Sequence, residues 1–526
     1  MTVTVDGETL TVEDVFAVAR EDEAVAIDDD AREAVRAARE RVADLLDSED
    51  AVYGVNTGFG DLVTERIPRE ELDRLQVNLV RSHAAGVGRE LAREEVRAMM
   101  LARLNTLVKG YSGVREVVVD HLTELLNEGI HPVVPSRGSL GASGDLAPLA
   151  HMALVLIGEG EADVQGDAGV ERLRGGEALA TARLDPLDLA PKEGLALING
   201  TQLTAGLGAL LVHDAERAVR AADIAGALTT EVTMGSTAAC DRAISAVRPH
   251  EGQAASARNV KRLTAGSEIV ESHRNCDRVQ DAYSIRCLPQ VHGAVRDATT
   301  HLREAVATEL NSATDNPLLY PRERVDDYAS GTADVAVLSG GNFHGAPLGH
   351  RLDYLAGALA DLAAISERRT DRLLNPNVQE DHLPPFLAPE SGLRSGYMLA
   401  QYAAAALVTE ARARGRPGTD TIPVSGNQED HVSMSAQSAF EARAALDDAV
   451  TVLAVELCCG TEASEYVDDD LSHGVGTGAA REAVREVVDP LTVDRSPAPD
   501  IERVDALLAG GLLDSRVREA VSNDLA

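Results

Sequence analysis

The sequence predicts a mainly α-helical protein, built as a long central helical bundle with a loop-rich N-terminal part. The first observation is composition: the 526 residues are 44% hydrophobic but only 3% aromatic, with no Trp. A core so poor in rings must be filled by aliphatic side chains, of which Ala and Leu favour helices. The second is that apolar residues recur at helical spacing in several segments. The third is residues 200–234, which are apolar on nearly all sides, as in a helix buried inside a bundle.

The N-terminal part, residues 1–199, contains two clear helical patterns. Apolar side chains three and four positions apart predict helices over residues 91–107 and 114–126. The two runs stop at Gly110 and Gly129, and glycine readily takes the left-handed conformation that ends a helix.

Residues 130–144 are predicted to form a loop, because they contain two prolines and three glycines. Asp145 then opens a further helix, with its carboxylate placed for the positive end of that helix. Residues 159–189, the least helical part, could form a small surface hairpin. Residues 200–526 are predicted to be the central and C-terminal helical bundle, with further helices near 290–310, 345–372, 393–414 and 433–462.

The charge balance is strongly acidic. The formal net charge is −37, and lysine occurs only at Lys109, Lys192 and Lys261. An acidic surface repels nucleic acid and anionic membranes, so neither is expected as a partner. The charge favours a halophilic protein, whose carboxylates keep it solvated and whose self-repulsion is screened by salt; an ordinary acidic enzyme is the alternative.

The five cysteines are odd in number and irregularly spaced, which argues against a disulfide framework and against a zinc site. The acidic N-terminus lacks the basic region of a signal peptide. No apolar run reaches the roughly 18 residues that a membrane span requires. The expected compartment is therefore the reducing cytoplasm.

The most informative segment is residues 138–148, Gly-Ser-Leu-Gly-Ala-Ser-Gly-Asp-Leu-Ala-Pro. The amide nitrogen of Gly144 can attack the carbonyl carbon of Ala142, and loss of water closes a five-membered ring. Loss of a second water from the Ser143 side chain leaves an exocyclic methylene, which gives the electrophile 4-methylidene-imidazol-5-one. Glycine at position 144 suits this attack because it has no Cβ to block the approach. The alternative is a turn that cradles phosphate before a helix, but such a loop needs a lysine, which this segment lacks.

Other motifs occur along the chain on both sides of this segment. They are Tyr53–Gly60 (YGVNTGFG), Arg81–Gly88 (RSHAAGVG), Asn199–Gln202 (NGTQ), Gln280–Cys287 (QDAYSIRC), Gly340–Gly345 (GGNFHG) and Asn427–Met434 (NQEDHVSM). Taken together, the motifs make the chain resemble the histidine ammonia-lyases, within the class of aromatic amino-acid lyases that carry this prosthetic group. The resemblance implies a fumarase/aspartase-like helical architecture, no metal, no dissociable cofactor, and a homotetramer whose active sites take residues from more than one subunit.

The resemblance also implies catalytic roles. It makes Tyr53, on a lid over the active site, a candidate base for the substrate β-proton. It places Asn199 beside the prosthetic ring as a hydrogen-bond donor and Tyr283 as a polar group facing that ring. A phenol has an ordinary pKa of about 10, so Tyr53 needs nearby positive charge to act as a base near neutrality. The residues alone leave a packing tyrosine in a turn and, for Asn199, a helix N-cap as alternatives.

Three further residues are expected to bind substrate. Arg286 resembles the clamp for the substrate carboxylate, because a guanidinium matches a carboxylate two-pronged. It lies three positions after Tyr283, so on a helix the two would share a face. Gln280 would be a neighbour of Tyr283, and Phe343 a wall of the pocket. A surface ion pair for the arginine and a core position for the phenylalanine are the alternatives.

The choice of substrate is expected to rest on His83 and Glu429. The histidine lyases have Ser-His and a later Glu at these sites, where phenylalanine lyases have apolar residues in place of the histidine. A buried carboxylate without a partner is costly, so Glu429 should reject phenylalanine. Each residue by itself could equally be a solvated side chain.

The resulting expectation is a carbon–nitrogen lyase that eliminates ammonia from L-histidine to give trans-urocanate, the first step of histidine degradation. A phenylalanine or tyrosine ammonia-lyase, or an aminomutase of the same family, is the nearest alternative. The fumarase/aspartase class is disfavoured, because its Gly-Ser-Ser-x-Met-Pro-x-Lys loop is absent from the sequence. A non-catalytic acidic helical scaffold would show no loss of two waters in its mass.

Overall fold

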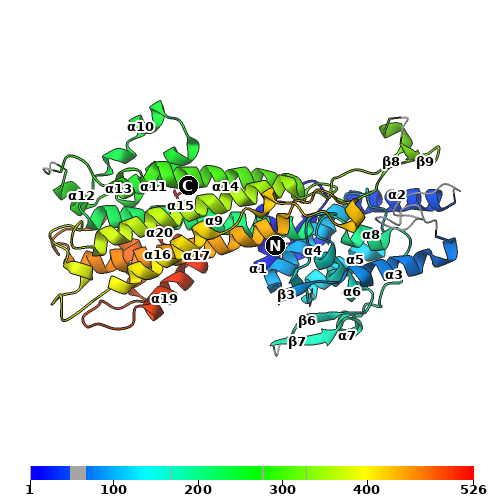
Figure 1. Cartoon of the computed structure of the whole chain (residues 1–526), viewed down its shortest axis with the longest axis horizontal. Coiled ribbons are helices and arrows are strands. Elements are labelled where there is room, and N and C mark those ends of the chain that lie inside the picture. The colour runs from blue at the N-terminus through cyan, green and yellow to red at the C-terminus, as the bar shows by residue number, and fades with distance from the viewer. Residues whose placement is uncertain (1, 48–66, 167–168, 275, 277, 327–328) are drawn as a thin grey trace. The chain divides into compact units, whose positions relative to one another are not determined.

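A computed structural model describes residues 2–47, 67–166, 169–274, 276, 278–326 and 329–526. The described chain is mainly helical, which confirms the predicted fold class (Figure 1). It divides into two compact units. Unit 1 comprises Met1–His213, Leu302–Asp353 and Arg416–Phe440, and unit 2 comprises Asp214–His301, Tyr354–Gly415 and Glu441–Ala526.

Unit 1 combines short helices with small sheets. Its helices are α1 (Val12–Arg20), α2 (Asp29–Leu46), α3 (Leu72–His83), α4 (Arg93–Val108), α5 (Glu116–Asn127), α6 (Leu146–Leu156), α7 (Gly175–Thr181) and α8 (Glu193–Ile198). Helix α4 is buried along almost its whole length. The predicted helices over residues 91–107 and 114–126 are thus confirmed as α4 and α5.

The described residues of unit 1 include four small sheets. Their strands are β1 (Thr2–Val5), β2 (Ala24–Ile27), β3 (Val87–Glu90), β4 (Ile130–Pro132), β5 (Pro135–Arg137), β6 (Glu161–Gly166), β7 (Gly169–Arg174), β8 (Leu318–Pro321), β9 (Ser330–Gly331) and β10 (Val335–Leu338). Strands β1 and β2 pair in parallel, and β3 pairs antiparallel with β5. The other sheets have the antiparallel orders β4-β6-β7 and β8-β10-β9.

Two expectations for this region are tested by the strands. The hairpin expected within residues 159–189 is confirmed, because β6 and β7 pair antiparallel in an exposed position. The loop expected over residues 130–144 is only partly correct, because β4 and β5 lie inside it. Each of these strands has only three residues and pairs with a strand from another part of unit 1. The local sequence therefore shows no periodicity from which the strand could be predicted.

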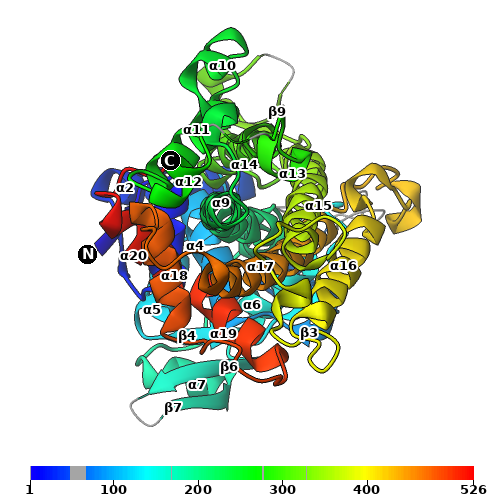
Figure 2. The same ribbon diagram turned by 90° about the vertical axis from the view of Figure 1, so that its left-hand side faces the viewer.

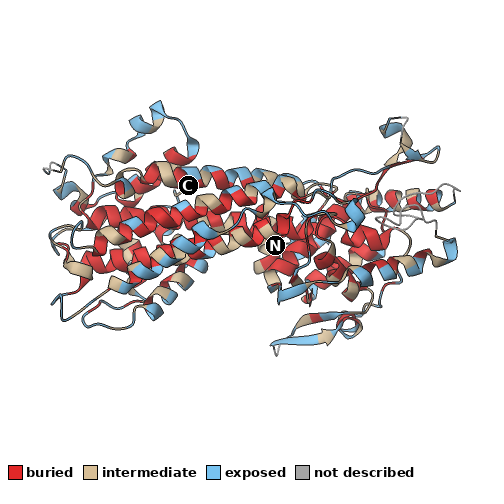
Figure 3. Ribbon diagram, in the orientation of Figure 1, coloured by how far each residue is buried: buried red, intermediate tan, exposed pale blue. Residues whose placement is uncertain are grey.

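Four long helices contain boundaries between the units: α9 (Gln202–Val232), α14 (Leu288–Leu310), α15 (Ala346–Leu374) and α17 (Ser435–Ala463). They match the helices predicted near 200–234, 290–310, 345–372 and 433–462. Helix α9 is buried over most of its surface, as its all-round apolar sequence predicts (Figure 3). Gly206 on α9 meets α4 closely, since an added Cβ would lie 2.8 Å from the carbonyl carbon of Ala98.

In unit 2 these long helices lie side by side around α9 (Figure 2). The other helices of this unit are α10 (Arg242–Val247), α11 (Glu251–Leu263), α12 (Glu268–Ser272), α13 (Tyr283–Arg286), α16 (Met398–Ala413), α18 (Val475–Arg485), α19 (Ala498–Ala509) and α20 (Leu512–Ala520). Within the described ranges, no helix is both long enough and apolar enough to cross a membrane.

A buried polar chain connects the long helices of unit 2. His292 Nδ1 contacts Asp223 Oδ1 at 2.8 Å, and Arg369 Nη1 approaches His292 Nε2 at 3.2 Å. Arg369 Nη2 also donates to Glu456 Oε2 at 2.8 Å. One of these residues comes from each of α9, α14, α15 and α17. A shift of any one helix would therefore leave buried polar groups on its neighbours without hydrogen bonds.

Candidate active site

The Ala-Ser-Gly segment lies between β5 and α6 in a backbone path that only glycine can follow. Gly144 has φ +76°, and a Cβ placed on it would lie 2.1 Å from Gly200 O. Gly200 O already accepts a hydrogen bond from Asp145 N at 2.7 Å. The turn is therefore pressed against the segment that precedes α9, with no room for a side chain between them.

The opposite side of the turn is held by residues just before α17. A Cβ on Gly141, whose φ is +63°, would lie 2.0 Å from Ser433 Oγ. Ser433 Oγ donates to Gly141 O at 3.2 Å, and Met434 N donates to Leu140 O at 2.9 Å. The Ala-Ser-Gly segment is thus clamped between two distant parts of the chain.

Asp145 does not cap α6 with its side chain, contrary to the expectation from the sequence. Its fully buried carboxylate accepts hydrogen bonds from Ser139 Oγ at 2.7 Å and from Thr204 N at 2.9 Å instead. Burial raises the pKa of this carboxyl above its usual value. Asp145 therefore ties the Ala-Ser-Gly turn to the first turn of α9 rather than stabilising its own helix.

Ser143 is contacted at both of its oxygens. Its hydroxyl donates to Glu429 Oε1 at 3.0 Å. Its main-chain oxygen accepts from Asn199 Nδ2 at 2.8 Å. Asn199 thus uses its side chain on Ser143 and not as an N-cap, and Glu429 is bonded within the site rather than only to solvent.

These residues line a cavity of about 680 Å³ in unit 1. Six of the residues expected from the sequence line it: His83, Ala142, Ser143, Asn199, Phe343 and Glu429. His83 Nδ1 is 2.8 Å from Leu79 O, so Nδ1 carries a proton, and in the neutral ring the other nitrogen, Nε2, is left to act as an acceptor.

Several residues that line the cavity were not singled out in the sequence: Asn316, Gln428, Asp430, His344 and His431. The rings of His344 and His431 are stacked, with centroids 5.8 Å apart and an interplanar angle of 4°. All but Asn316 lie inside the motifs around Phe343 and Glu429, so polar composition within those motifs was the available signal. Asn316 follows Asp315 and lies outside all of the motifs named from the sequence.

The remaining expected residues are not among those that line this cavity. Gln280, Tyr283 and Arg286 belong to unit 2. Tyr53 and its lid motif lie outside the described residues. On α13, Arg286 Cζ lies 4.8 Å from the centroid of the Tyr283 ring, so the two side chains share a face as their spacing predicts.

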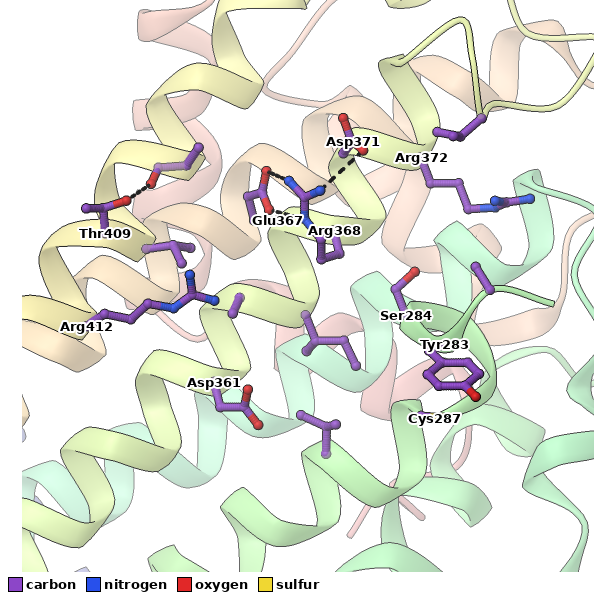
Figure 4. A pocket seen from close by; sticks show the side chains of 17 residues that line it. Tyr283, Ser284, Cys287, Asp361, Glu367, Arg368, Asp371, Arg372, Thr409 and Arg412 are labelled. Carbon is purple, nitrogen blue, oxygen red and sulfur yellow. Dashed lines mark hydrogen bonds and ion pairs between the residues drawn. The ribbon is translucent and has the colours of Figure 1, made fainter.

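Tyr283 lines a separate cavity of about 810 Å³ within unit 2 (Figure 4). The charged side chains in this cavity are largely paired with one another: Arg368 Nε donates to Glu367 Oε2 at 2.5 Å and Arg368 Nη1 lies 3.4 Å from Asp371 Oδ2. The cavity offers no counterpart of the Ser143 cluster, because the residues that line it are mostly aliphatic or already ion-paired.

A helical fold that holds a clamped Ala-Ser-Gly turn beside an amide donor defines a class of ammonia-eliminating enzymes. A family model described as aromatic amino acid lyase matches residues 10–486, and the chain belongs to this family. It is 62% identical over 524 residues to a probable histidine ammonia-lyase of Halobacterium salinarum, covering 100% of this chain and 99% of that protein.

Solved structures of the family have the same fold. The histidine ammonia-lyase of Trypanosoma cruzi is 36% identical, with a TM-score of 0.88 over 100% of this chain and 97% of that one. The tyrosine aminomutase of Streptomyces globisporus is 38% identical, with a TM-score of 0.92 over 100% of both chains. The resemblance seen in the sequence motifs is therefore confirmed across the whole chain.

Proposed function

We propose that this chain is an ammonia-lyase that catalyses the non-oxidative elimination of ammonia from L-histidine to give trans-urocanate. The observation that carries the proposal is the environment of Ser143: its carbonyl accepts from Asn199, its hydroxyl contacts Glu429, and a cavity with His83 opens beside it. The curated relative with 62% identity is named a probable histidine ammonia-lyase, which agrees with this substrate.

The residues present fit the prosthetic group 4-methylidene-imidazol-5-one. Ring closure joins Gly144 N to the carbonyl carbon of Ala142, and this needs a tight turn with no Cβ at position 144. The left-handed Gly144 and the contact of its Cα side with Gly200 meet that requirement. The second dehydration removes the Ser143 hydroxyl, which donates to the Glu429 carboxylate and lies at the cavity wall.

The group supplies an electrophilic carbon that turns the substrate amine into a better leaving group. That carbon derives from Ser143 Cβ, and it is conjugated with the carbonyl of Ser143. Addition of a nucleophile to that carbon would place negative charge on Ser143 O, and Asn199 Nδ2 donates a 2.8 Å hydrogen bond to this atom. Such a donor, aimed in advance at the developing charge, is the oxyanion-hole type of stabilisation.

Glu429 and His83 give the cavity its preference for an imidazole. Glu429 Oε1 accepts from the Ser143 hydroxyl, so loss of that hydroxyl on maturation would free the carboxylate to accept from the substrate, and Nε2 of the neutral His83 ring is a second acceptor. A phenyl ring offers neither group a partner, so it would leave polar atoms unsatisfied. The structural likeness to a tyrosine aminomutase supports the second candidate, a phenylalanine or tyrosine ammonia-lyase or an aminomutase of the same family. Measured substrate preference decides between the two candidates.

Tyr53 is proposed as the base for the β-proton, and Arg286, with Tyr283 and Gln280, as the group that binds the substrate carboxylate end. None of the last three lines the Ser143 cavity. In keeping with the family resemblance, we propose a homotetramer whose active sites take residues from more than one copy. All five cysteines are free thiols, which supports a place in the reducing cytoplasm.

The direct test is incubation with L-histidine, followed by detection of urocanate and ammonia. In parallel, intact mass should show the native chain lighter than its sequence by two waters. In Ser143→Ala the deficit should shrink to one water or none, and turnover should be lost. A fully active chain with an unmodified mass would refute the proposal.

Shared sites have their own test. Ser143→Ala and Arg286→Ala, each inactive or nearly so alone, are mixed, dissociated and reassembled. If a site combines the turn of one copy with the arginine of another, mixed oligomers regain activity, because some sites then contain both native parts. Mixtures that stay as inactive as their components would show that each copy is self-sufficient.

A further inference from the structure

Arg103, on α4, is a fully buried cation that contacts the segment carrying Asn199. Its Nη1 donates to Asn199 O at 2.8 Å and to Gln202 Oε1 at 2.8 Å. A single guanidinium nitrogen therefore joins the two ends of the Asn199–Gln202 turn. Burial lowers the pKa of Arg103 to about 10, so the side chain remains charged at neutral pH.

The turn is built closely around this guanidinium. Gly200 has φ +139°, and a Cβ there would lie 2.9 Å from Arg103 Nη1. Gln202 is fixed in turn, because its Nε2 donates to Thr314 Oγ1 at 2.6 Å and to Thr106 Oγ1 at 3.1 Å. The orientation of Asn199 is thus set by a rigid frame whose centre is Arg103.

Of the other ionisable side chains near this frame, Glu309 is bonded to a hydroxyl of the turn, and the rest are engaged elsewhere. Lys192 Nζ and Asp315 Oδ2 form a fully buried pair at 2.8 Å. Glu309 accepts from Thr201 Oγ1 at 2.5 Å, and Asp145 is bonded to Ser139 and Thr204. Burial raises the pKa of both of these carboxyl groups. Arg103 is the cation whose hydrogen bonds reach the turn itself.

Stability alone is a poor reason for placing an arginine here. Within the described part of the chain, its Nε and Nη2 are buried and have no hydrogen-bond partner. Burying a charge with unsatisfied donors costs free energy, and an apolar side chain of similar size would avoid that cost. What the guanidinium does provide is a charge-assisted hydrogen bond to the main chain of Asn199.

We propose that Arg103 is a positioning residue for the elimination: it holds the Asn199–Gln202 turn so that Asn199 Nδ2 stays aimed at Ser143 O. The proposal rests on the proposed function, in which Ser143 O carries developing negative charge. Losing one donor of this kind typically costs about a hundred- to a thousandfold in kcat. A donor displaced by about 1 Å can cost about a hundredfold. Arg103→Gln should therefore lower kcat by about ten- to a hundredfold with little change in KM.

The decisive experiment is a double-mutant cycle with Asn199→Ala. If Arg103 acts through Asn199, Arg103→Gln should cost no more than about twofold in the Asn199→Ala background, because the group it positions is already gone. Arg103→Lys keeps the charge but loses the planar fork, so it should give a smaller loss that also disappears in that background. This milder variant keeps the test available if Arg103→Gln does not fold.

Arg97 offers a matched control on the same helix. It is also buried, burial lowers its pKa to about 10 as well, and it donates to Val18 O at 2.8 Å and to Leu126 O at 2.9 Å, away from the turn. Arg97→Gln should lower the thermal midpoint but leave kcat per folded chain within about twofold. Equal losses of kcat in the two arginine variants would overturn the proposal.

A measurement without substrate completes the test. Cyanide, a small nucleophile, adds to the electrophilic carbon of the matured chain, and intact mass follows the rate. Arg103→Gln should slow this addition about tenfold or more, while leaving the two-water deficit in place. Suppose the wild-type chain releases urocanate, but the losses of Arg103→Gln and Asn199→Ala simply add and cyanide addition is unchanged in Arg103→Gln. That result would refute the role of Arg103 and leave the proposed function standing. A wild-type chain that neither loses water nor releases urocanate would refute the proposed function instead.

Discussion

Replacing Glu429 with Gln should change which amino acid the enzyme prefers. The carboxylate is held 3.0 Å from Ser143 Oγ and lines the cavity beside the reacting segment. In the proposed complex it accepts a hydrogen bond from the substrate imidazole. Glu429→Gln keeps the length of the side chain and one acceptor oxygen, but it removes the charge.

The expected size follows from the difference between two kinds of hydrogen bond. A bond to a charged group contributes about 1.5–3 kcal/mol, and a neutral one about 0.5–1.5 kcal/mol. The change should therefore cost histidine about 1–1.5 kcal/mol, which is roughly a five- to thirteenfold loss in kcat/KM. For phenylalanine the sign reverses, because an unpaired carboxylate facing a phenyl ring costs more than an unpaired amide. The ratio of kcat/KM for histidine over phenylalanine should fall by about tenfold or more.

The assay is kcat/KM for both amino acids in each variant, per matured chain. Normalisation by intact mass is needed because Glu429 also contacts the hydroxyl that must be lost. Asp430→Asn is the matched control: it removes a carboxylate from the same cavity that is not bonded to Ser143, and it should change the ratio by less than about twofold. Arg286→Ala should damage both substrates alike. If Glu429→Gln leaves the ratio unchanged while Arg286→Ala shifts it, the assignment of the two ends is reversed or wrong.

Three further changes test the fold and its charge. Gly144→Ala should abolish the two-water deficit and lower the thermal midpoint, because its Cβ would lie 2.1 Å from Gly200 O. The control is Gly266→Ala, at a glycine with the same φ of +76° but open space around it, which should keep the deficit and lose only a little stability. Intact mass and thermal unfolding measure both effects. With a net charge of −37, the thermal midpoint should rise from low to molar KCl as salt screens self-repulsion, and a flat or falling midpoint would contradict this. Burial beside Arg97 lowers the pKa of His131 from 6.5 to about 3, so below pH 6.5 the unfolded chain takes up a proton that the folded chain does not. The free energy of unfolding should fall as pH drops from 6.5 toward 3, by at most about 1.4 kcal/mol per pH unit from this group. His131→Gln should reduce that slope in urea unfolding, and an unchanged slope would count against the shifted pKa.

The helices could be predicted because their apolar spacing is a local property. The segment over residues 91–107 is α4, and the all-round apolar run after Gly200 is α9. The short strands β4 and β5 could not be predicted in the same way, since what makes them strands is pairing with β6 and β3. Nonlocal contacts of this kind leave no periodic signal in the sequence.

The candidate site was predictable only as far as its motifs. The chemistry of Ala142, Ser143 and Gly144 follows from their residue types, and the resemblance supplied Asn199 and Glu429. The contact between Ser143 and Glu429 joins residues 286 positions apart, so spacing could not reveal it. For Asp145 the local sequence was misleading. Its place before a helix suggested a cap, but its carboxylate accepts hydrogen bonds from Ser139 and Thr204 instead.

The clamp on the Ala-Ser-Gly turn also sets when the chain can become chemically reactive. One jaw is Gly200, and the other is Ser433, whose contact with Gly141 spans 292 residues. During synthesis, the second jaw emerges long after the turn itself has left the ribosome. Under the proposed maturation, a nascent, truncated or misfolded chain carries an ordinary alanine, serine and glycine. It has no electrophile to which cellular amines and thiols could add. The electrophile can therefore form only after the distant segments have packed against the turn, so its presence indicates that the chain has folded completely.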